Sequence, residues 1–190
     1  MAPKPWKIIS TNTDRSYRVF GLRKDRSVSP RTGHEYDFFV LESNPWVNVI
    51  PLTEDNQVVL VRQYRHGIRD VTLEIPGGLV DEGDTPEQAA WRELSEETGY
   101  GAEEMIPLGF VYPNPAIQNN KCYTFFAKNA MQVGEQDQDG GEDIEILVKP
   151  LAEIPRLIHD GVITHSLVVV AFYRYFMEYA RGATLKYTPS

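Results

Sequence analysis

The segment 76–99 constrains the fold of this chain most, because it joins a tight turn to a well-delimited helix that carries clustered carboxylates. A glycine pair at 77–78 follows a short apolar stretch, where the chain must turn tightly or admit a ligand close to the backbone. Thr85 fits a helix N-cap and Pro86 fits the first helical position, where a missing N–H costs nothing. Gly99 fits the left-handed residue that ends a helix. The pattern predicts a strand, a glycine turn and one helix.

Three carboxylates of this helix fall on one face. With about 100° per residue, Glu93, Glu96 and Glu97 lie within roughly 100° of one another. Like charges at this spacing repel, and Arg92 relieves only part of the repulsion. A divalent cation such as Mg²⁺, which takes oxygen ligands, would complete the cluster. The alternative is an ordinary solvated acidic face.

Charge is uneven along the chain. The formal net charge is −8, and of the 27 acidic residues ten lie in 74–104 and six in 131–145, leaving a mildly basic remainder. This balance argues against nucleic acid as the main partner, since binding phosphate backbones requires a basic face. The apolar stretch 167–173 is too short to span a membrane, the N-terminus does not read as a secretory signal, and Cys122 has no internal disulfide partner. We therefore expect no membrane and a cytoplasmic location.

The remaining pattern interleaves strands and helices, which predicts an α/β fold. The first 43 residues show no helix signal and predict a small β-rich subdomain. The predicted strands are 15–24, 35–42, 46–52, 58–65, 72–75, 105–112, 121–128 and 143–148, with a turn at 27–33. The further predicted helices are 151–160, closed by Gly161, and 167–181, capped by Ser166.

The spacing from Gly78 through Asp84 to the run Arg92-Glu93-Leu94-Ser95-Glu96-Glu97-Thr98-Gly99-Tyr100 resembles the Nudix box, G-x5-E-x7-R-E-U-x-E-E-x-G-U. Asp84 stands where the family usually has Glu, and Tyr100 stands where a bulky aliphatic residue is usual. Neither departure removes a carboxylate from the helix face. The resemblance therefore implies a catalytically active member of the Nudix hydrolases.

The resemblance extends to the ADP-ribose and nucleoside-diphosphate-sugar pyrophosphatase group. It rests on the strand and motif at 58–65, the stretch 73–78 and Pro115, which follows the last glycine of the box by sixteen residues. It implies a Nudix α/β/α sandwich with a mixed sheet over 44–190. It also implies a homodimer in which the subdomain 1–43 contacts the partner and can be exchanged with it.

The same resemblance implies a Mg²⁺ site, with Mn²⁺ as a possible substitute. The implied ligands are the carbonyl of Gly77 and the carboxylates of Glu93, Glu96, Glu97 and Glu142. Glu93 and Glu97 would be the main ligands and Glu96 would assist them. The catalytic set would be Glu142 as general base, Glu96, and Arg92, which orients the carboxylates by ion pairing. Asp139 or another acid is the alternative base.

Candidate substrate-binding residues are Arg65, Pro115 and Asn119. Arg65 could clamp a phosphate bidentately or form an ordinary surface ion pair. Asn119 and Asn120 could bind a sugar or phosphate, or stabilise a turn. Possible walls for a nucleobase, each alternatively core or interface packing, are Tyr17, Phe20 and Trp46.

The implied activity is Mg²⁺-dependent hydrolysis of a nucleoside diphosphate sugar to a nucleoside monophosphate and a sugar phosphate. Pro115 is followed by Ala116, where enzymes acting on ADP-ribose commonly have glycine, so ADP-ribose and GDP-mannose-type substrates both stay open. The alternatives are hydrolysis of another nucleotide, such as a dinucleoside polyphosphate, capped RNA or a coenzyme, and a Nudix-like nucleotide sensor without catalysis.

Overall fold

The structure, a computed structural model, describes residues 2–138, 140–141 and 143–179. Contacts divide the chain into two compact units. The first runs from the N-terminus to residue 45 and includes 111–121, and the second comprises 46–110 and the chain from 122 onward. The division into 1–43 and 44–190 stays a prediction about domain organisation.

The first unit contains a three-stranded antiparallel sheet in the order β1-β2-β3. Its strands are β1 (Lys7–Ser16), β2 (Gly21–Val28) and β3 (Glu35–Glu42). The prediction of one strand over 15–24 is wrong, because a turn closed by a hydrogen bond from Tyr17 N to Phe20 O (2.8 Å) separates β1 from β2. The aromatic rings that suggested strand continuity contact each other in this turn, with centroids 4.9 Å apart.

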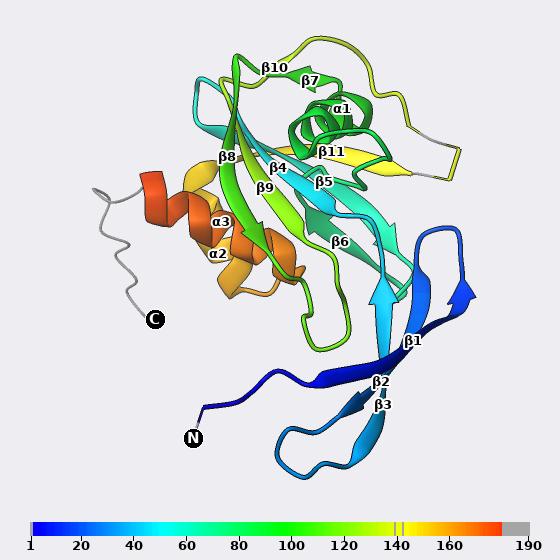
Figure 1. Cartoon of the computed structure of the whole chain (residues 1–190). Helices are drawn as coiled ribbons and strands as arrows, with labels where there is room; N and C mark the ends of the chain where they lie inside the picture. The colour runs from blue at the N-terminus through cyan, green and yellow to red at the C-terminus, as the bar shows by residue number, and fades with distance from the viewer. Residues whose placement is uncertain (1, 139, 142, 180–190) are drawn as a thin grey trace. The chain divides into compact units, whose positions relative to one another are not determined.

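The second unit is built on a six-stranded mixed sheet (Figure 1), in which β11-β5-β4-β9-β8 run side by side and β6 pairs with β5. The strands are β4 (Trp46–Leu52), β5 (Gln57–Arg65), β6 (Asp70–Glu74), β8 (Glu104–Val111), β9 (Cys122–Lys128) and β11 (Ile144–Pro150). β4 and β9 are parallel, whereas β5 is antiparallel to β4, β6 and β11. A separate pair consists of β7 (Tyr100–Gly101) and β10 (Met131–Gln132).

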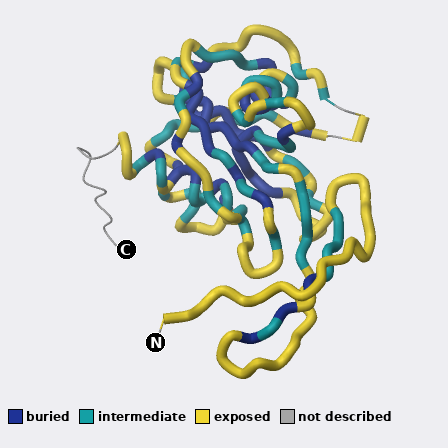
Figure 2. Tube along the Cα trace, in the orientation of Figure 1, coloured by how far each residue is buried: buried dark blue, intermediate teal, exposed yellow. Residues whose placement is uncertain are grey.

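Helices cover both faces of this sheet. α1 (Pro86–Thr98) lies on one face, and α2 (Ile154–His159) and α3 (Ser166–Tyr179) lie on the other (Figure 1). The alternation of side chains along β4 shows why: Val49 packs with α1, and Ile50 packs with α2 and α3. Figure 2 shows the sheet strands as the most buried part of this unit. The predicted α/β/α sandwich with a mixed sheet is confirmed.

The ends of α1 follow local sequence chemistry, as predicted. Thr85 accepts a hydrogen bond from the Gln88 backbone, and the Gln88 side chain accepts one from the Thr85 backbone. Pro86 occupies the first helical position. Gly99 ends the helix with φ 68° and donates to Ser95 O. The helix carrying the carboxylates is therefore fixed at both ends.

The C-terminal helices are close to the prediction. The segment predicted as one helix over 151–160 is a 3₁₀ turn (Leu151–Glu153) followed by α2. Gly161 follows it in the left-handed region with φ 71°. The predicted end of α3 at residue 181 lies outside the described residues. No helix in the described part of the chain is both long and apolar enough to cross a membrane.

Candidate active site

The glycine pair lies where a larger residue would meet backbone at Gly77 and a carboxylate of α1 at Gly78. Residues 76–78 run beside β4, with hydrogen bonds from Val47 N to Gly78 O and from Val49 N to Pro76 O, both 2.9 Å. A Cβ at Gly77 would lie 2.3 Å from Val47 O, and a Cβ at Gly78 would lie 2.4 Å from Glu93 Oε1. Because neither glycine has a side chain, the backbone of the turn can lie close to β4 and to α1.

Two of the three predicted carboxylates of α1 face this turn. Glu93 is 8% exposed and Glu97 is 4% exposed. Glu97 Oε2 accepts a hydrogen bond of 2.8 Å from the amide of Gly77, and Glu93 abuts Gly78. Residues four apart on a helix share a face, so one helix turn presents both acids to the glycines. Glu96 is more exposed and lies beside Arg92.

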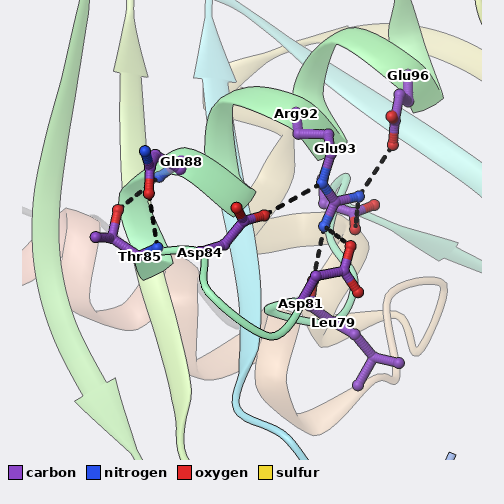
Figure 3. A network of polar contacts seen from close by, with 8 residues as sticks. All are labelled: Leu79, Asp81, Asp84, Thr85, Gln88, Arg92, Glu93 and Glu96. Carbon is purple, nitrogen blue, oxygen red and sulfur yellow. Dashed lines mark hydrogen bonds and ion pairs between the residues drawn. The ribbon is translucent and has the colours of Figure 1, made fainter.

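Arg92 is the centre of a charged network, which Figure 3 shows from close by. Its guanidinium donates to Glu93 Oε1 (2.9 Å), to Glu96 Oε2 (3.0 Å) and to the carbonyl of Leu79 (2.9 Å). It also forms ion pairs with Asp81 at 3.3 Å and Asp84 at 3.8 Å.

The charges of this network do not balance. Burial lowers the pKa of Arg92, and the carboxylates of Glu93 and Glu96 raise it by more, so its pKa lies above its ordinary value. Four carboxylates thus share one guanidinium, which leaves excess negative charge around the start and middle of α1.

The donor chemistry of this region fits a hard divalent cation. Buried carboxylates carry a high desolvation cost unless a cation or hydrogen bonds compensate them, and Mg²⁺ prefers carboxylate and carbonyl oxygens. Within the described ranges, no group of three or more His, Cys, Asp or Glu side chains is gathered closely enough to hold a metal ion. Two of the predicted residues, Glu142 and the alternative base Asp139, lie outside the described residues. The predicted metal-ligand set therefore stays a prediction.

Arg65 and Glu74 form a two-pronged ion pair on adjacent strands. Arg65 Nε donates to Glu74 Oε1 and its NH2 group donates to Oε2, both at 2.8 Å. Burial raises the pKa of Glu74, but the hydrogen bonds from Arg65 and Thr72 lower it by more, so this carboxylate stays ionised below its usual range. The ion pair expected as one alternative for Arg65 is thus present. The other alternative, phosphate binding by Arg65, stays a prediction.

Pro115 and Asn119 belong to the first unit. Asn119 Oδ1 accepts from the amide of Ser43, and its Nδ2 donates to Glu42 Oε1, both at 3.3 Å. Pro115 lies in a turn in which Asn114 O accepts hydrogen bonds from the amides of two following residues. Their roles in substrate binding stay predictions.

Two polar residues that line a cavity were not predicted from the sequence. Asn48 and His165 line a cavity in the second unit together with Arg65 and Glu74. Asn48 is a polar residue within the otherwise apolar run 46–52, which was an available signal. For His165, which precedes α3, the sequence offered none.

Comparison with known proteins adds family information to this geometry. The NUDIX domain family matches residues 42–168. An "ADP-ribose pyrophosphatase" of Bacillus subtilis is 29% identical over 59% of this chain and 61% of its own length. A "Methanol dehydrogenase activator" of Bacillus methanolicus is 30% identical over 87% of this chain and 89% of its own length. An "ADP-sugar pyrophosphatase" of Mus musculus is 32% identical over 76% of this chain and 68% of its own length.

A solved structure shares the fold. The crystal structure of an "ADP compounds hydrolase" superposes with a TM-score of 0.83, covering 94% of this chain and 96% of that one at 23% sequence identity. The arrangement of sheet and helices is therefore one already known from a solved structure.

Proposed function

Because the chain belongs to the NUDIX domain family, we propose that it hydrolyses the pyrophosphate bond of ADP-linked sugars, ADP-ribose among them. The observation that carries this proposal is the pair of buried carboxylates, Glu93 and Glu97, held against the glycine turn within a region of excess negative charge. The names of two relatives support the substrate class. The products would be AMP and a sugar phosphate.

A divalent cation, Mg²⁺ or alternatively Mn²⁺, would be held by Glu93 and Glu97, with Glu96 assisting and the carbonyl of Gly77 as a further oxygen ligand. When bound, such an ion screens phosphate charge and lowers the pKa of a coordinated water. Glu142 would complete the ligand set and accept the proton of the attacking water as general base. This assignment for Glu142 rests on the resemblance alone.

Arg92 would act on the carboxylates and not on the substrate. Its hydrogen bonds to Glu93 and Glu96, together with the one to Leu79 O, tie the acidic face of α1 to the loop after the glycine pair. Its positive charge is compensated by the carboxylates of the four ion pairs described above. It would therefore hold the orientation of the ligands.

Arg65 would bind a phosphate of the substrate. Its side chain is 40% exposed, and it lines the same cavity as Gly77 and Gly78. A guanidinium has five N–H donors, and the pair with Glu74 fixes its plane for bidentate recognition. Pro115 and Asn119 would contribute to substrate binding, with GDP-mannose-type substrates as the alternative to ADP-sugars.

A homodimer formed through the first unit is part of this proposal. All ten residues of β1 are exposed, and apolar side chains at the surface of this unit include Trp6, Ile8 and Phe39. An apolar sheet surface of this kind is typical of an interaction site. Size-exclusion chromatography with light scattering would measure the dimer, and a monomer at micromolar concentration would contradict it. We also propose a cytoplasmic location.

One substrate panel tests the activity. ADP-ribose, ADP-glucose, GDP-mannose, a cap analogue, a dinucleoside polyphosphate and NADH are incubated with and without Mg²⁺, and the products are separated by chromatography. The expected result is Mg²⁺-dependent release of AMP from ADP-sugars. Turnover of the cap analogue alone would contradict the sugar assignment, and turnover of none would favour a nucleotide sensor.

A further inference from the structure

The segment 133–138, which follows β10, packs against the C-terminal end of α1 (Figure 1). The backbone amide of Gly134 donates to the carbonyl of Gly99 at 3.0 Å. The backbone amide of Asp137 donates to the carbonyl of Glu96 at 2.9 Å. The approach is so close that a Cβ on Gly99 would lie 2.5 Å from the carbonyl oxygen of Gly134. Because the last carbonyls of a helix have no partners within the helix, this segment supplies donors that α1 itself cannot.

Gln136 connects α1 to the sheet through one side-chain nitrogen. Its Nε2 donates to the carbonyl of Glu97 at 2.6 Å and to the carbonyl of Ile144 at 3.2 Å. Both partners are carbonyl oxygens, so the atom that contacts them is the nitrogen of the amide. Ile144 is the first residue of β11, is 5% exposed and pairs with Gln63 of β5. Gln136 therefore ties the last turn of α1 to a fixed point of the sheet.

Glu97 is thereby held at both of its ends. Its carboxylate accepts a hydrogen bond of 2.8 Å from the amide of Gly77, and its backbone carbonyl accepts the one from Gln136. The last turn of α1 reads Ser-Glu-Glu-Thr and contains no basic residue. Carboxylates there lie at the negative end of the helix dipole, which disfavours them. Donors to the last carbonyls offset part of this cost, and a cation bound by Glu97 would offset more of it.

Gln138 provides a contrast within the same segment. Its Nε2 donates to the carbonyl of Ile144 at 3.0 Å, and its Oε1 accepts from the amide of Ile144 at 3.1 Å. These two bonds join the segment to β11 and do not involve α1. Gln136 and Gln138 are both half-buried. The two glutamines thus allow contact with the sheet to be separated from contact with α1.

We propose that Gln136 is a positioning residue for the divalent cation of this site, because its side-chain amide holds the last turn of α1 and, with it, the carboxylate of Glu97. The inference rests on the proposed function, which takes Glu97 as a ligand of that cation. Without the Gln136 amide, the carbonyl of Glu97 loses a donor at a helix end, where fraying is easiest. The Glu97 carboxylate would then lose its fixed orientation, and the cation would bind more weakly.

Binding of Mn²⁺ tests this role without turnover. Free aqueous Mn²⁺ gives an electron paramagnetic resonance signal that is lost on binding, so a titration measures the dissociation constant. Gln136→Met removes the donor with little change of shape, and Gln136→Asn draws the amide back by one methylene. Gln138→Met is the matched control, since it makes the same substitution at contacts with β11 alone. Glu97→Gln identifies the signal of this site, and thermal unfolding shows which variants are folded.

The expected result is that Gln136→Met weakens Mn²⁺ binding about tenfold, the lower end of the range for groups that orient metal ligands. Gln136→Asn should weaken it less, and Gln138→Met should leave it unchanged. Both Met variants should lower the melting temperature, whereas a merely structural role of Gln136 would not move the Mn²⁺ affinity. Unchanged affinity in both Gln136 variants would overturn the proposal. Equal weakening in Gln138→Met, or no effect of Glu97→Gln, would overturn it as well.

Hydrolysis of ADP-ribose by the wild type is assayed separately and tests the proposed function. If the protein is active, the Mg²⁺ concentration for half-maximal rate should rise in Gln136→Met, with a smaller change in the rate at saturating Mg²⁺. An absence of hydrolysis, with Mn²⁺ bound by the wild type and weakened by Glu97→Gln, contradicts the proposed function and leaves the role of Gln136 to be decided by the titrations. An absence of Mn²⁺ binding by the wild type would overturn the role of Gln136.

Discussion

Gly78 lies directly against the carboxylate of Glu93: a methyl group in place of the glycine hydrogen would lie 2.4 Å from Oε1 and 2.5 Å from Cδ. A residue fifteen positions earlier in the chain therefore sets the position of a carboxylate on α1. Glycine at this position leaves room for the Glu93 carboxylate, and its backbone conformation does not by itself call for glycine. The relation links the turn to the predicted metal ligand.

Gly78→Ala should impair the site while leaving the fold intact. The added methyl group pushes the flexible Glu93 side chain aside. The fold can therefore be kept, but the Glu93 carboxylate is moved away from the place where it would bind a cation. We expect the rate of ADP-ribose hydrolysis to fall about 10–100-fold, as for other perturbations of ligand orientation. Gly134→Ala, where an added Cβ meets nothing within 4 Å, is the control. Equal activity of both variants would contradict the role of the contact.

Glu97→Gln should separate catalysis from stability. The amide oxygen of glutamine can still accept the 2.8 Å hydrogen bond from Gly77 N, but the negative charge for a cation is lost. We expect the rate of ADP-ribose hydrolysis to fall by more than the roughly 10–100-fold typical of mutating a residue that only contacts a metal ligand. We also expect weaker activation by Mg²⁺. The measurement is the rate as a function of Mg²⁺ concentration, with the exposed Glu87→Gln as control. A near-normal rate would rule out Glu97 as a ligand.

The ion pair of Arg65 and Glu74 should make stability depend on pH in the acid range. The pKa of Glu74 in the folded protein lies below its ordinary value of 4.5, so the unfolded chain binds the proton more readily. The stabilisation is complete above pH 4.5 and is lost as the pH falls through the folded pKa.

Melting temperatures of wild type and Glu74→Gln measure this effect. We expect a difference of about 1 kcal/mol, or roughly 2–4 °C, at pH 7 that shrinks below pH 4.5. Glu145→Gln removes the exposed pair with Arg62 and serves as the control, with little change at any pH. A difference that does not shrink as the pH is lowered below 4.5 would refute the assignment.

Cys122 should resist alkylation in the folded protein. Burial raises the pKa of its thiol to about 12, so almost no thiolate is present at pH 8. The residue is 1% exposed, which also blocks access of a reagent. Mass spectrometry after treatment with iodoacetamide should show no modification in buffer and one in denaturant, since the chain has a single cysteine. Rapid modification of the native protein would contradict the buried position.

Local chemistry determined the elements that the sequence predicted best. Each end of α1 is set by residues within one turn of that end: Thr85, Pro86 and Gln88 at its start, and Gly99 at its finish. The limits of the helix could therefore be derived without the rest of the chain. The shared face of Glu93 and Glu97 follows from helical geometry alone. The strand expected over 15–24 was wrong because local composition could not distinguish two structures. Aromatic residues such as Tyr17 and Phe20 are typical of a strand, but here their rings contact each other across a turn.

Only the tertiary structure decided what surrounds these elements. The pairing of Arg65 with Glu74 depends on the antiparallel register of β5 and β6, and the cavity brings Asn48 together with His165, residues more than a hundred positions apart. No short-range preference encodes such contacts, because the first arises from strand pairing and the second from packing α3 against the sheet. The sequence alone thus determined an acidic helix behind a glycine turn. Packing decided which carboxylates are buried against that turn and which polar atoms line the neighbouring cavity.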